Sequence, residues 1–289
     1  MTLAHGAEAS PWQFQPHPEV WAPMLLLLVG YFVAVKRFDP SRVEPGQPVV
    51  TAVQKACFLL GVAALWIGAD WPIHDLSENY LFSVHMVQHL LFTFVAPPLL
   101  LLGLPAWMLR MVLGRGLRFR LVRFFVKPVV ALIAFNATIA VTHWPPIVNA
   151  AIGSEPIHLL VHAVLIGTAL AMWWPVVAPL PEAPSLSEPA KMLYLFLQSI
   201  VPTVPASFLT FSTAPLYSSY AALPHPWIST VADQRIAGLI MKILGGLLLW
   251  IVIAVIFFRW NAKEERGEVA SALTWEDFER DLEVWELRK

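Results

Sequence analysis

The sequence predicts an all-α integral membrane protein with seven transmembrane helices, an outer N-terminus and a cytoplasmic C-terminus. Three observations lead to this fold class. The 289 residues are 57% hydrophobic and only 13% charged, with a mean hydropathy of +0.63, whereas a soluble domain has about 25% charged residues. Seven stretches reach the length of about 20 apolar residues that a spanning helix needs. The basic residues fall in alternate connections between these stretches.

The predicted spans follow one another through short connections: 20–36, 52–70, 80–103, 128–147, 157–178, 191–211 and 234–258. Pro97 and Pro98 in the third span and Pro202 in the sixth are expected to kink their helices, because proline lacks a backbone donor. Gly238 in the seventh span would let another helix approach closely. Proline and polar residues also interrupt the fourth span, 128–147.

The orientation follows from the positive charges. Of the 19 Lys and Arg, all but Arg235 and Lys242 lie in 36–55, in 110–127, at position 191 or from position 259 onward. These segments are alternate connections plus the C-terminus, so the positive-inside rule places them in the cytoplasm. The net charge of −1 gives no indication of a nucleic-acid partner.

The chain divides into an outer N-terminal segment (1–19), a seven-helix membrane domain (20–260) and a charged cytoplasmic tail (261–289). The first segment has no basic residue and no apolar core, so it does not have the pattern of a signal peptide. The tail places four large apolar residues at helical spacing between acids: Trp275, Phe278, Leu282 and Trp285. This pattern predicts an amphipathic helix that lies on the membrane or on a partner.

All nine histidines fall on the outer side of this topology, opposite the Lys and Arg. His85 and His89 begin the third span four residues apart, and His158 and His162 repeat this spacing in the fifth. Residues four apart share one face of a helix. His143 closes the fourth span. Three neighbouring elements therefore bring five imidazoles to a similar depth.

This pattern predicts a metal site. Met86 shares an arc with His89, and Met241 lies at a comparable depth in the seventh span. Imidazole suits Zn, Cu, Fe and Ni, while thioether favours Cu(I), so copper as Cu(I) is expected. The single cysteine excludes a thiolate cluster within one chain. The expected ligands are His85, Met86, His89, His143, His158, His162 and Met241. Asp233 and Asn136 would orient these ligands; equally, Asp233 would cap a helix and Asn136 would bridge two helices.

Four alternatives compete with a bound copper ion. The histidines would hydrogen-bond neighbouring helices in a metal-free scaffold. Facing histidines would hold a haem, although two on one helix a turn apart cannot both be its axial ligands. A transporter would carry ligands further down the pathway. Lys242 would suit a retinal protein, but the third span has no carboxylate counter-ion. No enzymatic activity is expected, because no activated nucleophile is evident. His5, His17, His74 and His225 have no spacing that ties them to the site.

Three stretches resemble, in order, the signatures of the CtaG family of seven-helix cytochrome c oxidase assembly factors: YLFSVHMVQHLLFTFVAPPLLLLGLP, THWPPIVNAAIGSEPIHLLVHAVLIGTALAMWWPVVAP and ADQRIAGLIMKILGG. The resemblance covers residues 20–260. It implies a multi-pass protein of the bacterial cytoplasmic membrane that helps to mature a haem–copper oxidase by delivering copper. The implied partners are cytochrome c oxidase subunits, periplasmic copper donor proteins and membrane lipid, and a homo-oligomer remains open. The matched polar positions are His85, Met86, His89, His143, His158, His162, Asp233 and Met241.

Overall fold

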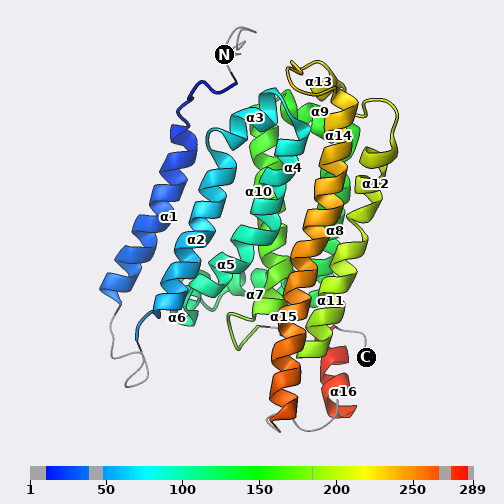
Figure 1. The fold of residues 1–289 in the computed structure, drawn as a ribbon. Coiled ribbons are helices and arrows are strands. Elements are labelled where there is room, and N and C mark those ends of the chain that lie inside the picture. The colour runs from blue at the N-terminus through cyan, green and yellow to red at the C-terminus, as the bar shows by residue number, and fades with distance from the viewer. Residues whose placement is uncertain (1–10, 39–47, 184, 267–274, 286–289) are drawn as a thin grey trace.

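The computed structural model describes residues 11–38, 48–183, 185–266 and 275–285, and these form helices without a β-strand (Figure 1). Within these residues six helical segments are long and apolar enough to cross a membrane. The number rises to seven if α7 (Leu117–Phe125) and α8 (Pro128–Thr142), bent by 75°, count as one span. The all-α membrane class is confirmed, whereas the count of seven and the orientation stay predictions.

Several of the spans consist of more than one helix stacked end to end. Thus α2 (Ala52–Ala69) continues into α3 (Ile73–Asn79), α4 (Phe82–Leu90) into α5 (Ala96–Gly103), α11 (Glu188–Ile200) into α12 (Thr203–Phe211), and α14 (Thr230–Leu239) into α15 (Gly245–Glu265). The π-helical turns η2 (Leu91–Val95) and η3 (Ile240–Leu244) lie between α4 and α5 and between α14 and α15, respectively. The remaining elements are α1 (Pro18–Arg37), α6 (Ala106–Leu113), α9 (Pro145–Ile152), α10 (Glu155–Val177), α13 (Ser218–Ala221) and α16 (Trp275–Val284).

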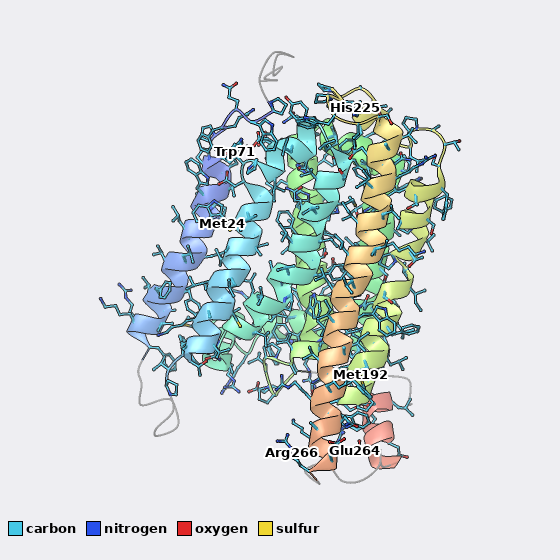
Figure 2. All side chains as sticks on the ribbon, in the orientation of Figure 1. Met24, Trp71, Met192, His225, Glu264 and Arg266 are labelled. Carbon is cyan, nitrogen blue, oxygen red and sulfur yellow. The ribbon has the colours of Figure 1, made fainter. Side chains whose placement is uncertain are left out.

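The two ends of the bundle differ in character. The short helices α3, α9 and α13 cover one end, which we call the outer end after the expected orientation, and α6, α7 and α16 lie at the other (Figure 1). Figure 2 shows Trp71 and His225 at the outer end, and Glu264 and Arg266 at the opposite end. His225 and Arg266 therefore lie at opposite ends of the bundle, which is the distribution that the sequence pattern indicated for these two residues.

The fourth predicted span, 128–147, is wrong at its outer boundary. Helix α8 ends at Thr142, and Pro145 begins the separate helix α9. Trp144 adopts an extended conformation because the ring of a following proline disfavours the helical region for the residue before it. With 15 residues, α8 qualifies as a span only together with α7. His143 consequently caps α8 at the outer end.

The third span contains the π-helical turn η2 directly after His89. The carbonyl of Thr93 would normally accept from the amide four or five residues on, but both positions are proline (Pro97 and Pro98). The indole of Trp173 on α10 donates to this carbonyl instead, at 2.8 Å. Because a buried carbonyl needs a partner, the two prolines leave the Thr93 carbonyl to the Trp173 indole, and this hydrogen bond links the third span to α10. The expected kink in the sixth span is also found, since α11 ends and α12 begins on either side of Pro202.

Close helix contacts hold the bundle together. A Cβ atom on Gly238 of α14 would lie 2.5 Å from Thr210 Oγ1 and 2.8 Å from the Ala206 carbonyl oxygen of α12, so the close approach expected at Gly238 is confirmed. At the edge of the bundle, Tyr31 of α1 stacks on Phe58 of α2 with ring centroids 3.9 Å apart.

The tail helix α16 packs against the end of the bundle that lies opposite the outer end (Figure 1). The carboxylate of Asp281 accepts hydrogen bonds from the backbone amide (3.2 Å) and the hydroxyl of Ser187, which caps α11. Trp285 packs against Tyr194 of α11 with ring centroids 5.9 Å apart. A helix therefore forms where the tail pattern predicted one; the side chains of Trp275 and Phe278 lie outside the described residues.

Candidate metal centre

Three buried imidazoles converge between α4 and α10. The ligand nitrogens of His85, His158 and His162 all lie within 4.8 Å of one another. His158 and His162 follow each other along α10 with ring centroids 4.2 Å apart, and His85 faces them from α4 at 6.0 and 5.8 Å. Because metal–nitrogen bonds are about 2 Å long, small side-chain rotations would bring all three nitrogens onto one ion. We call these residues the outer triad.

A carboxylate fixes one member of the outer triad. Glu78 Oε1 lies 2.5 Å from His158 Nδ1 and 3.4 Å from His74 Nε2. His158 Nδ1 is thus held in a close contact with the carboxylate, and Nε2, which is buried without a hydrogen-bond partner, is the ring nitrogen left to offer a lone pair. Carboxylate–histidine pairs of this kind orient ligands and raise their basicity in metal sites. Sequence reasoning missed Glu78; its signal was the four-residue spacing from His74 on the short helix α3.

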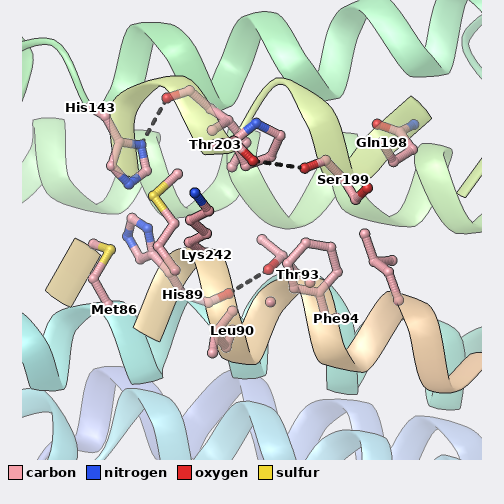
Figure 3. A pocket seen from close by; sticks show the side chains of 16 residues that line it. Met86, His89, Leu90, Thr93, Phe94, His143, Gln198, Ser199, Thr203 and Lys242 are labelled. Carbon is pink, nitrogen blue, oxygen red and sulfur yellow. Dashed lines mark hydrogen bonds between the residues drawn. The ribbon is translucent and has the colours of Figure 1, made fainter. Parts of the chain in front are cut away.

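A second group lies directly below the outer triad. His89 of α4 is 5.7 Å from His143 and 5.4 Å from His162, centroid to centroid. Together with Met86 and Met241, His89 and His143 line a cavity of about 30 Å³ (Figure 3). We call these four residues the inner group. All four side chains are buried, at 2–8% exposure.

The tautomer of His143 follows from its surroundings. His143 Nδ1 lies 2.8 Å from the carbonyl oxygen of Ile139, so Nδ1–H donates and Nε2 keeps the lone pair. Tyr217 donates to the His143 carbonyl at 3.0 Å and holds the residue in place. His143 Nε2 is therefore the ring nitrogen that is free to coordinate an ion.

The five histidines leave an unusual number of buried nitrogens without a hydrogen-bond partner. There are six such atoms: His85 Nδ1, His89 Nδ1, His89 Nε2, His143 Nε2, His158 Nε2 and His162 Nε2. Each unsatisfied buried polar group costs about 1–3 kcal/mol, and few occur in a native structure. A borderline or soft cation would use these lone pairs, so the donor set fits a metal ion.

Two histidines that sequence reasoning left open extend the cluster outward. His74 lies 5.9 Å from His158 and 4.9 Å from His17, centroid to centroid. His17 in turn contacts Asp75 at 3.0 Å and Glu19 at 2.8 Å. Burial would lower the pKa of His17, but the hydrogen bonds to these two carboxylates outweigh it and raise the pKa.

His225 does not extend it. His225 Nε2 bonds the carbonyl of Tyr220 at 3.0 Å, and His5 lies outside the described residues.

Asp233 and Asn136 make hydrogen bonds that position helices. Asp233 accepts hydrogen bonds from the backbone amides of Phe82 (2.6 Å) and Ser83 (3.1 Å), so it caps α4 and sets the position from which His85 projects. Asn136 donates to Gln198 at 2.7 Å and bridges α8 to α11. Gln88, which sequence reasoning missed, is fully buried and donates to the Gly68 carbonyl at 2.8 Å, which ties the histidine-bearing helix to α2.

The fold and the site together define a multi-pass membrane protein with a buried histidine cluster near one end of its helical bundle. The chain belongs to the family of cytochrome c oxidase caa3 assembly factors (Caa3_CtaG), whose family model matches residues 29–263. The resemblance seen in the three sequence stretches is thereby confirmed.

Curated relatives come from mycobacteria. Uncharacterized proteins of Mycobacterium bovis and Mycobacterium tuberculosis are each 25% identical to this chain over 271 residues, which is 86% of this chain and 39% of theirs. A Mycobacterium leprae protein is 24% identical over 274 residues. The chain therefore spans about two fifths of the length of these relatives. No solved structure matches the chain at a significant level.

Proposed function

We propose that this chain binds copper through its histidine cluster and delivers it to cytochrome c oxidase during assembly. The oxidase is inferred as the recipient because the chain belongs to a family of cytochrome c oxidase assembly factors. The observation that supports metal binding is the convergence of three buried imidazoles, with ligand nitrogens within 4.8 Å of one another and His158 oriented by Glu78. Copper is cargo in this proposal, and the protein acts without enzymatic chemistry in the bacterial cytoplasmic membrane.

The geometry favours a small ion over a haem. A haem would have to slide between two facing axial histidines such as His85 and His158. Their ring centroids are 6.0 Å apart, and the ring of His162 packs against both, at 5.8 and 4.2 Å. A third imidazole thus occupies the space that a porphyrin needs, whereas one ion fits among the three rings.

The position of the cluster supports loading and release at the outer end. His17, His74 and His158 form a row of imidazoles from the outer end towards the triad. Thioethers occur beside the imidazoles, and this donor pair favours Cu(I) over zinc. A periplasmic copper donor would load this row, and an oxidase subunit would remove the ion. A weakly held ion suits such a transfer, because the receiving site must bind it more tightly.

The test is elemental analysis of the untagged, detergent-purified protein after anaerobic loading with Cu(I), with copper, iron and zinc counted per chain. We expect copper in the wild type and its loss in the double variant His85→Ala/His89→Ala, which removes donors from both the outer triad and the inner group. His225→Ala, at the same end of the bundle, is the matched control and should retain copper. Iron accompanied by a Soret band, or copper occupancy unaffected by the double variant, would refute the proposal.

Delivery is tested separately in cells that make the oxidase. Cells carrying His85→Ala/His89→Ala should yield oxidase with less copper than cells carrying His225→Ala, at equal levels of both membrane proteins. Normal copper in the oxidase of the double variant would favour the metal-free scaffold instead.

A further inference from the structure

The inner group differs from the outer triad in its donors. The outer triad has three imidazoles and, through Glu78, a carboxylate behind one of them. The inner group has two imidazoles and two thioethers around one cavity of about 30 Å³, which none of the triad residues lines. Figure 3 shows His89, His143, Met86 and Lys242 around this space. A cavity of this size holds a single small occupant.

Both imidazoles of the inner group present buried nitrogens that have no hydrogen-bond partner. His143 is locked as the Nδ1–H tautomer by Ile139, and its free Nε2 is buried without a partner. Both nitrogens of His89 are buried without a partner as well. A ligating histidine commonly donates its second ring N–H to a carbonyl, which is what His143 does here.

Two π-helical turns border this cavity and bring its residues together. Turn η2 follows His89 and contributes Thr93 and Phe94 to the lining, and η3 contributes Met241 and Lys242. The double proline after η2 and the bond from Trp173 to the Thr93 carbonyl maintain the first turn. Such turns are frequent at functional sites, because they shift side chains out of the regular helical register.

Lys242 biases the charge of the occupant. Lys242 is an exposed residue whose side chain lines part of the same cavity, and its positive charge repels a cation that binds there. Coulomb repulsion scales with the charge of the ion, so it is twice as large for a divalent ion as for Cu(I). Thioether donors act in the same direction, since they prefer Cu(I) over zinc. Both features select a soft monovalent ion.

We propose that the protein holds two copper ions, and that His89, His143, Met86 and Met241 form a second, thioether-containing Cu(I) site below the outer triad. The contact between His89 and His162, with centroids 5.4 Å apart, lets an ion pass between the sites by exchange of ligands. The ion stays Cu(I), so the passage requires no electron donor or acceptor. This inference rests on the proposed copper binding and adds the number of ions and the chemistry of the inner site.

The experiment counts Cu(I) per chain in anaerobically loaded, detergent-purified full-length protein and records copper X-ray absorption for sulfur neighbours. We expect two ions and a copper–sulfur contribution in the wild type. The variant Met86→Leu/Met241→Leu conserves side-chain volume. It should retain one ion with only light-atom neighbours. Met172→Leu, a fully buried methionine of α10 outside the cavity lining, is the matched control and should keep two ions.

Two further variants separate the sites. His158→Ala should keep one ion that retains its sulfur neighbours. Lys242→Gln should tighten retention of the sulfur-bound ion severalfold against a Cu(I) chelator, because it removes the repelling charge of an exposed side chain at the cavity. One ion per chain without sulfur neighbours, unchanged in Met86→Leu/Met241→Leu, would overturn the inner site and leave the outer triad standing. No copper in any variant would overturn both proposals.

Discussion

The contact between Glu78 and His158 gives a quantitative test of the outer triad. We consider the substitution Glu78→Gln, which preserves the shape of the side chain and removes its charge. The carboxylate lies 2.5 Å from His158 Nδ1. With about 2 Å across the ring and a metal–nitrogen bond of about 2 Å, an ion on His158 Nε2 would lie roughly 6.5 Å from the carboxylate.

The loss of affinity can be worked out from this distance. Two opposite unit charges 6.5 Å apart attract by about 2.5 kcal/mol at an effective dielectric constant of about 20. This energy corresponds to a factor of about 70 in the dissociation constant. Glu78 is 29% exposed, so water screens part of the attraction. We therefore expect Glu78→Gln to weaken Cu(I) binding roughly 10- to 70-fold, within the usual range for residues that support a metal ligand.

The assay is anaerobic competition with a chromophoric Cu(I) chelator, with size-exclusion chromatography to check that the variant is folded. Glu155→Gln is the matched control, because Glu155 is an exposed acid one turn before His158 on the same helix. It should change the dissociation constant by less than about twofold, as expected for an exposed, screened charge. Equal affinities of Glu78→Gln and Glu155→Gln would refute the role assigned to Glu78.

Three other predictions concern the scaffold. His17 has a raised pKa in the folded protein, so the stabilisation from its ion pairs is fully present below pH about 6.5 and is lost as the pH rises through the folded pKa. His17→Gln should therefore lower the unfolding temperature at pH 6 but not at pH 8.5. An equal effect at both pH values would contradict this. Gly238→Ala should destabilise the protein by about 1–3 kcal/mol in thermal unfolding, because the new methyl meets backbone of α12. Gly167→Ala, with no atom within 4 Å of its Cβ, should be neutral or slightly stabilising, and equal effects of the two would refute the packing argument. Asp281→Asn should raise hydrogen exchange of α16 about tenfold by weakening a charge-assisted bond to α11, while Glu283→Gln, on an exposed acid of α16, should leave it unchanged and serves as its control.

The sequence by itself determined the membrane class, six of the spans to within a few residues at most ends, and the two histidine pairs. These features are local: apolar length and four-residue spacing depend only on helix geometry. It also indicated the close helix contact at Gly238, because a missing side chain is visible in the sequence.

Local signals failed where a partner came from elsewhere in the chain. The prediction for 128–147 overran Thr142 for a different reason, because the local signal of the two prolines that follow Trp144 was outweighed by apolar length. Asp233 was expected to orient an imidazole or cap its own helix, whereas it caps α4, about 150 residues away in the chain. No periodicity encodes a contact over such a separation.

The tertiary structure alone decided how the histidines divide. Packing of α4 against α10 puts His85 with His158 and His162, and Glu78 reaches His158 from the short helix α3. His89 and Met86 of α4 and Met241 of the π-helical turn η3 line a separate cavity with His143. The sequence specified which donors lie near the outer end, because helix period and charge distribution fix their depth. Their grouping into an outer triad and an inner group depends on how the helices rotate and pack against one another, which only the assembled bundle determines.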